Sequence, residues 1–179
     1  MIQAIPEQLG IIACPGGAAF AAKMIADLEE VSQKKFRRKV EFLAQKYGTT
    51  KQEIIRGINL QSDLRPTTTD LGQPTDQARP LSFRVPAQFT RFANGEFKTE
   101  ILATVRNLDV YVFQDVENHY PIALNRGDAE RVSLSVNDHV FCLLTTIDAA
   151  LQAGAKTVTA VLPTYPYSRQ HKKLGRESL

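Results

Sequence analysis

The sequence predicts an α/β fold with a mainly parallel sheet and flanking helices. Short runs of apolar and β-branched residues begin at Gly10, Asp109 and Thr157, and amphipathic segments with helical spacing separate these runs. Strands that alternate with helices favour a parallel sheet with right-handed connections. A length of 179 residues with 43% hydrophobic and 23% charged residues fits one globular domain.

The first predicted unit is a strand, a tight turn and a helix. Residues 10–14 (GIIAC) form the strand, residues 15–17 (PGG) form the turn, and residues 18–30 repeat apolar side chains at helical spacing. A glycine turn of this kind can hold a phosphate at the helix N-terminus. A plain tight turn is the favoured interpretation, because no fuller glycine fingerprint follows.

Residues 31–80 are predicted to leave the core as a helical insertion with a Pro- and Thr-rich end. A second helix over residues 31–48 has one apolar face: Phe36, Val40, Leu43 and Tyr47. Basic residues crowd the remainder: Lys34, Lys35, Arg37, Arg38 and Lys39. Thr50 and Glu53 form a capping box for a short helix through Arg56. The basic run can contact an anionic partner, but a solvated helix face is the favoured explanation.

The core resumes at Leu81 with predicted β structure. Residues 81–85 and 88–92 have strand character, Asn94 and Gly95 supply a turn, and residues 97–105 alternate as a further strand. Residues 109–114 and 157–162 are typical of strands that are covered on both faces.

Between those two covered strands we expect an irregular segment and a helix. Residues 118–131 are irregular, and Asn137 with Asp138 offers an N-cap to a helix through Ala153 that ends at Gly154. Cys14 and Cys142 lie in apolar stretches, so we expect buried free thiols rather than a disulfide.

A loop rich in aromatic and basic residues follows the last strand. It begins at Pro163 and contains Tyr165, Tyr167, Arg169, Lys172 and Lys173. Ligands of open α/β sheets bind beyond the carboxyl ends of the strands. Composition alone leaves two explanations open, a loop for an anionic ligand and a solvated basic loop.

Four blocks together resemble one enzyme family. Residues 92–96 read F-A-N-G-E, residues 105–114 read V-R-N-L-D-V-Y-V-F-Q, and residues 162–173 read L-P-T-Y-P-Y-S-R-Q-H-K-K. The fourth block is the N-D-H at residues 137–139 with the apolar helix that follows it. Taken in their order along the chain, the four blocks resemble the ribose-phosphate pyrophosphokinases, the phosphoribosyl diphosphate synthetase family.

The resemblance implies a phosphoribosyltransferase-like N-terminal domain and a defined reaction. The family transfers the diphosphoryl group of ATP to ribose 5-phosphate with Mg²⁺, in the cytoplasm, as homo-oligomers. By matching positions, the ATP-binding residues are Phe92, Asn94, Gly95, Glu96, Arg169 and Gln170, with possible phosphate contacts from Lys172 and Lys173. In the family a neighbouring subunit often contributes the F-A-N-G-E block. Two alternatives without a ligand stay open: Phe92 is an ordinary core residue, and Glu96 is a surface acid that caps a turn.

The sequence departs from the family pattern at three positions. His171 replaces the Asp of the family pattern, Asn107 replaces the usual Gly, and His139 replaces the second Asn of N-D-N. A lone histidine is more often structural or solvated than a ligand, so we assign no metal ligand to His171.

The whole chain, residues 1–179, is expected to be an N-terminal domain without its C-terminal partner. No acidic loop followed by T-G-G-T, which in the family binds ribose 5-phosphate, occurs in the sequence. We therefore expect no catalytic residue in this chain and no activity from it alone. The alternative is a non-catalytic or regulatory half-domain that binds nucleotide and associates with a complete synthetase.

The charge balance gives weak signals about other partners. A net charge of +3 and the lack of a long uncharged apolar run lead us to expect neither nucleic acid nor a membrane as partner. A third hypothesis remains, an interaction module that binds nucleic acid through the basic helix at residues 34–39 with steep salt dependence.

Overall fold

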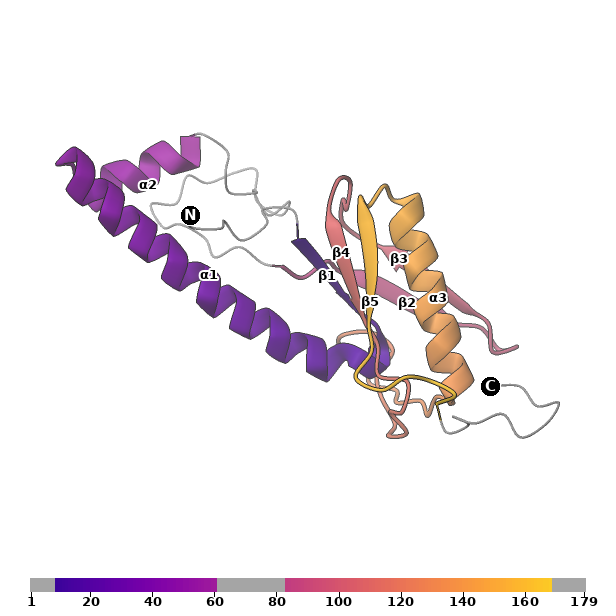
Figure 1. Ribbon diagram of the computed structural model, residues 1–179. Helices are drawn as coiled ribbons and strands as arrows, with labels where there is room; N and C mark the ends of the chain where they lie inside the picture. Colours follow the sequence, from indigo (N-terminus) through magenta and orange to yellow (C-terminus); the bar gives the residue numbers. More distant parts are fainter. Residues whose placement is uncertain (1–8, 61–82, 169–179) are drawn as a thin grey trace.

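Figure 1 shows a computed structural model that describes residues 9–60 and 83–168. A parallel sheet contains β1 (Leu9–Ala13), β4 (Asp109–Phe113) and β5 (Thr157–Val161) in the order β1-β4-β5. Asp109 of the central strand is in register with Leu9 on one side and Thr157 on the other. The predicted α/β fold with a parallel sheet is confirmed.

The strands of the sheet differ in burial. β1 and the central strand β4 each contain three buried residues, and Val110 and Val112 of β4 are fully covered. The prediction that residues 157–162 form a strand covered on both faces is wrong, because every residue of β5 is half-buried or exposed. Among the strands that the structure describes, β5 lies at the edge of the sheet and pairs only with β4.

Residues 83–85 extend the sheet next to β1. The Ile11 N–H donates to the Phe83 carbonyl oxygen at 2.8 Å, and the Val85 N–H donates to the Ile11 carbonyl oxygen at 2.8 Å. The predicted strand character of residues 81–85 is therefore present as an isolated parallel bridge at Arg84, while residues 81 and 82 lie outside the described part.

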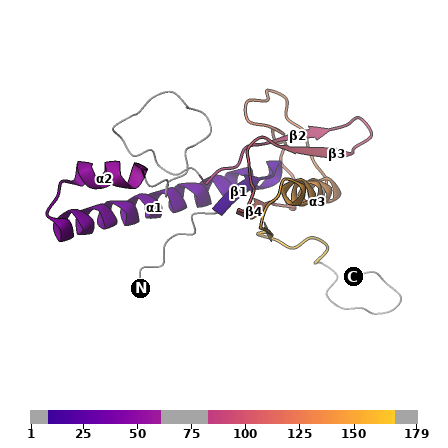
Figure 2. The same cartoon turned by 90° about the horizontal axis from the view of Figure 1, so that it is seen from above.

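A short 3₁₀ turn, η1 (Pro15–Gly17), joins β1 to the helix α1 (Ala18–Tyr47). The prediction of separate helices over residues 18–30 and 31–48 is wrong, because α1 continues for 30 residues without a break. No glycine or proline interrupts this segment, and an ion pair between Glu30 and Lys34 crosses the predicted boundary. Figures 1 and 2 show α1 running away from the sheet.

The helix α2 (Lys51–Leu60) follows and confirms the predicted capping box. A Glu53 carboxylate oxygen accepts from the Thr50 N–H at 3.0 Å, and the Glu53 N–H donates to the Thr50 hydroxyl at 3.3 Å. Hydrogen bonds from the Thr49 hydroxyl and from the Thr50 N–H and hydroxyl lower the pKa of Glu53 to about 2. The helix runs four residues beyond the predicted end at Arg56.

An antiparallel hairpin and a third helix complete the fold. β2 (Ala87–Arg91) pairs with β3 (Phe97–Ile101), and β3 packs against α3 (Val136–Gln152). The strand predicted over residues 97–105 stops at Ile101, but the turn at Asn94 and Gly95 is confirmed, with Gly95 at φ 92°.

The side chain of Asn125 covers the outer edge of the hairpin. Its amide oxygen accepts from the Phe89 N–H at 2.7 Å, and its amide nitrogen donates to the Phe89 carbonyl oxygen at 3.1 Å. The irregular segment predicted over residues 118–131 therefore protects a strand edge that would otherwise be open to pairing.

The two cysteines are free and buried, as predicted. The Cys14 thiol lies 3.5 Å from the Thr146 hydroxyl on α3, and Cys142 belongs to the same core cluster as Cys14. The neighbouring Cys14 thiol and burial raise the pKa of the Cys142 thiol well above its ordinary value. Both thiols thus act as small apolar core groups.

Candidate functional site

The hairpin between β2 and β3 presents three of the predicted ATP-binding side chains at its exposed tip. The Phe92 N–H donates to the Glu96 carbonyl oxygen at 2.8 Å, and the Gly95 N–H donates to the Phe92 carbonyl oxygen at 2.9 Å. The Asn94 amide oxygen accepts from the Glu96 N–H at 3.2 Å, which fixes the turn. The alternative of Phe92 as ordinary core is wrong, because the residue is 46% exposed. Glu96 is also exposed.

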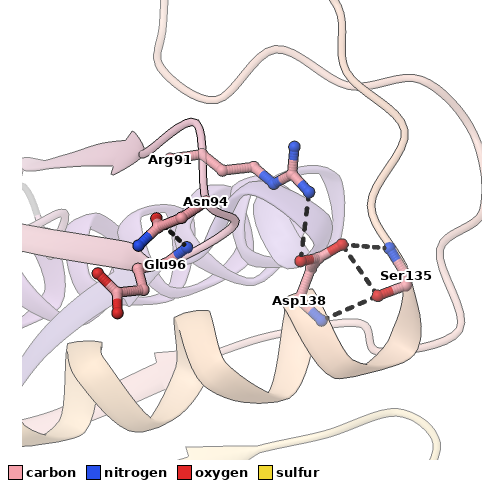
Figure 3. Close-up of polar contacts among 5 residues, drawn as sticks. All are labelled: Arg91, Asn94, Glu96, Ser135 and Asp138. Carbon is pink, nitrogen blue, oxygen red and sulfur yellow. Dashed lines mark hydrogen bonds and ion pairs between the residues drawn. The ribbon is translucent and has the colours of Figure 1, made fainter.

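An ion pair ties this hairpin to the N-terminus of α3. Figure 3 shows Arg91 reaching toward Asp138, and an Arg91 guanidinium nitrogen lies 3.6 Å from an Asp138 carboxylate oxygen. Asp138 also accepts from the N–H and the hydroxyl of Ser135, both at 2.9 Å. The Asp138 N–H donates back to the Ser135 hydroxyl at 3.2 Å.

The cap of α3 differs from the predicted one. The N-cap is Ser135 and not Asn137 or Asp138, because Ser135 forms a capping box with Asp138 as its third helical residue. Burial of Asp138 would by itself raise the pKa of its carboxyl group. The hydrogen bonds from Ser135 and the charge of Arg91 outweigh burial, so the pKa is lowered.

The loop after β5 reaches the same end of α3. The Tyr167 hydroxyl donates a hydrogen bond to the Asn137 amide oxygen. Tyr167 has a positive φ of 59°, and Tyr165 is 73% exposed. The hairpin and the segment leading to Arg169 therefore meet at one helix terminus. The remaining predicted site residues lie outside the described part of the chain: Arg169, Gln170, His171, Lys172 and Lys173.

The structure also explains the other two departures from the family pattern. Asn107 adopts a positive φ of 61°, a conformation that Gly adopts freely and Asn tolerates better than other residues. His139 is fully buried, and its Nε2 lies 2.8 Å from the Asn118 carbonyl oxygen. Local structure therefore accommodates Asn107, whereas the other ring nitrogen of His139, Nδ1, is buried with no hydrogen-bond partner among the described residues.

The comparison with known families decides where this chain belongs. Residues 79–179, more than half of the chain, match the family model described as the N-terminal domain of ribose phosphate pyrophosphokinase. The chain belongs to this family. The match contains the hairpin, β4, α3, β5 and the basic loop, so it covers every residue of the predicted ATP site.

Individual relatives carry the same family name. A ribose-phosphate pyrophosphokinase of Synechococcus elongatus is 39% identical over 90 residues, which are 50% of this chain and 22% of that protein. Ribose-phosphate pyrophosphokinase 5 of Schizosaccharomyces pombe is 39% identical over 83 residues, 46% of this chain and 20% of that protein. The matched segment thus spans about a fifth of the length of these curated relatives.

A solved structure is also similar. The phosphoribosylpyrophosphate synthetase from Mycobacterium smegmatis shares 34% identity, with a TM-score of 0.40, over 53% of this chain and 27% of that chain.

A metal-binding cluster and a membrane-spanning helix are both absent from the part of the chain that the structure describes. Within residues 9–60 and 83–168, no three His, Cys, Asp or Glu side chains gather in a way that could hold a metal ion. None of the helices described there is long and apolar enough to cross a lipid bilayer.

Replacing Asp138 by alanine should destabilise the protein and loosen the hairpin. The change removes a cap partner and the Arg91 ion pair, so we expect a loss of about 1 kcal/mol and a fall in Tm of about 2–4 °C. Hydrogen exchange at residues 92–96 should accelerate. Because the folded-state pKa of Asp138 is lowered, its contribution to stability is present above the pKa of the unfolded carboxyl and is lost as the pH falls through the folded value.

The matched control is Asp148→Ala, which changes an exposed aspartate on the same helix. Thermal melts and exchange rates should stay at wild-type values in this variant. Equal effects of the two substitutions would contradict the role assigned to Asp138.

Proposed function

We propose that this chain supplies the ATP-binding part of a ribose-phosphate pyrophosphokinase. The reaction is the Mg²⁺-dependent transfer of the diphosphoryl group of ATP to ribose 5-phosphate, which yields phosphoribosyl diphosphate and AMP. The observation that supports it best is that Arg91, next to the hairpin block, and Tyr167, in the loop block after β5, contact adjacent residues at the N-terminus of α3.

The hairpin tip has the chemistry to bind adenosine. The exposed ring of Phe92 offers a face on which adenine can stack. The oxygen of the Asn94 amide is engaged in the turn, so its NH₂ group is the donor that can reach a base or ribose acceptor. The exposed carboxylate of Glu96 can accept from an amino or hydroxyl group.

The basic loop after β5 would contact the phosphates of ATP. Arg169 offers a planar fork to phosphate oxygens, Gln170 adds neutral donors, and Lys172 and Lys173 add point charges. During transfer, the anomeric hydroxyl oxygen of ribose 5-phosphate bonds to the β-phosphorus of ATP. The bond from that phosphorus to the oxygen of the departing AMP breaks, and the hydroxyl proton is released. Positioning and charge neutralisation supply most of the rate of such a step.

We assign no metal ligand to residues 9–60 and 83–168, because these residues do not form a metal-binding cluster. Magnesium enters the proposal as the ion that accompanies the ATP phosphates and neutralises part of their charge. Homo-oligomers are a further part of the proposal. An exposed hairpin tip such as this one is suited to reach the site of a neighbouring copy.

Calorimetric titration of the chain tests this function. We expect ATP with Mg²⁺ to bind, ribose 5-phosphate to give no binding heat, and a mixture of both to form no phosphoribosyl diphosphate. Absence of ATP binding, or binding of ribose 5-phosphate in place of ATP, would contradict the proposal.

A further inference from the structure

α1 and α2 meet at a corner in the order helix, short turn, helix. α1 ends at Tyr47, residues 48–50 form a three-residue turn, and α2 begins at Lys51. Gly48 has the left-handed conformation with φ 63°, which is common at the residue that ends a helix before a short turn. Two helices joined by a turn of three or four residues that contains a glycine are typical of DNA-binding helix–turn–helix units.

Specific contacts hold this corner together. Lys51, at the start of α2, forms a 2.7 Å ion pair with Glu41 on α1. The Thr49 N–H donates to the Ala44 carbonyl oxygen at 3.1 Å. Val40 is buried, and Ile54 is half-buried on α2. The two helices therefore form a defined unit and not a loose extension.

The charge of the corner is strongly asymmetric. Residues 34–56 contain eight basic side chains and only two acidic ones, Glu41 and Glu53. Both acids are exposed but have partners in the corner, Glu41 in Lys51 and Glu53 in Thr50. All eight basic side chains are exposed: Lys34, Lys35, Arg37, Arg38, Lys39, Lys46, Lys51 and Arg56. The small net charge of the whole chain conceals this local excess.

We propose that the α1–α2 corner binds double-stranded DNA, with α2 in the major groove. The major groove accommodates a single α-helix, and the first turns of the second helix contact base edges. Here those turns expose Gln52, whose amide can pair with adenine, and Arg56, which can pair with guanine or a phosphate. This proposal extends the third hypothesis from the sequence and replaces the expectation of no nucleic-acid partner, and it does not depend on the proposed enzymatic function.

Among the described residues, the α1–α2 corner lies apart from the hairpin tip. In both Figure 1 and Figure 2 the α1–α2 corner lies far from the β2–β3 hairpin and from α3. A duplex at the corner would therefore lie away from the hairpin tip of the candidate ATP site.

Other anionic surfaces fit this corner less well. Binding flat on a membrane needs a continuous apolar face on the helix. Phe42 is 62% exposed, but Arg38 and Lys46 lie one turn away from it on either side. Single-stranded nucleic acid is bound by successive aromatic side chains along a groove, and Phe42 has no aromatic residue three or four positions away on α1.

Fluorescence anisotropy with the full chain and a labelled duplex of about 20 base pairs tests the proposal. Affinity should fall steeply between about 50 and 200 mM salt, as expected for release of counterions from phosphates. The double variant Lys46→Ala/Arg56→Ala should bind at least about tenfold more weakly and lower the slope of log K against log salt by about 2. Circular dichroism checks that the variant keeps its helices.

The control is Lys98→Ala/Lys156→Ala, which removes the same number of exposed basic side chains from the sheet side of the molecule. This variant should bind the duplex with wild-type affinity and slope. Equal losses in the two double variants, no binding to the duplex, or tighter binding to a single-stranded RNA of the same length would overturn the proposal. ATP titrations of the same samples report separately on the enzymatic function.

Discussion

Replacing Arg169 by alanine should weaken ATP binding by this chain at least about 100-fold. The substitution removes a planar guanidinium that can donate paired hydrogen bonds to phosphate oxygens, and charge-assisted bonds contribute about 1.5–3 kcal/mol each. Arg169→Lys should recover only part of the affinity, because lysine keeps the charge but not the fork. Calorimetric titration with ATP and Mg²⁺ measures all three affinities.

A matched control for this experiment is Arg131→Ala, which changes an exposed arginine in another loop. ATP affinity should be unchanged in that variant. Wild-type ATP affinity in Arg169→Ala would show that the basic loop is not part of the nucleotide site.

Replacing Gly17 by alanine should destabilise the fold by about 1–3 kcal/mol or more, since overpacking in a rigid interior has costs of this size. A Cβ atom at Gly17 would lie 2.6 Å from the Phe113 carbonyl oxygen and 2.8 Å from the Gln114 Cα, and neither backbone atom can move away easily. Urea unfolding monitored by circular dichroism measures the free-energy difference.

The control is Gly127→Ala, where a Cβ would meet nothing within 4 Å and only the positive φ of 97° adds strain. Its effect should be about 1 kcal/mol and smaller than that of Gly17→Ala. An equally small effect at Gly17 would contradict the packing role of the turn. Gly16 is buried against Asp115 and His139, and Gly17 is buried against the end of β4, so the structure supports the plain-turn interpretation over a phosphate-binding loop.

The sequence predicted those features that local chemistry determines. The Thr50 and Glu53 cap, the Asn94 and Gly95 turn and the helix end at Gly154 all depend on residues close in sequence, and each is present. The covered strand at residues 109–113 was also predictable, because a continuous β-branched run suits the centre of a parallel sheet.

Features set by distant contacts were harder to predict. The edge position of β5 depends on the strand order, which local patterns do not reveal. Helix α1 continues past residue 30 although its outer half leaves the core, because nothing in the sequence stops it. The Arg91–Asp138 pair joins residues 47 positions apart, so only the fold brings these charges together.

The cap of α3 was a different kind of error. Ser135 precedes Asp138 by three positions, which is the spacing of a capping box with Asp in place of the usual Glu. The signal was present in the sequence, but Asn137 and Asp138 are themselves common N-cap residues, so the predicted cap lay two or three residues too far along the chain. Of the candidate site, the exposed hairpin tip is now described in structure, whereas the roles of residues 169–173 remain predictions from the resemblance.

The central claim is that the hairpin tip and the loop after β5 form one ATP site. Photocrosslinking with an azido-adenine ATP analogue, followed by peptide mass spectrometry, tests it most directly. We expect labelled peptides to contain residues 92–96 and residues 165–173, and excess ATP to suppress both. Labelling confined to other segments, such as the glycine turn at residues 15–17 or the basic helix α1, would contradict the account.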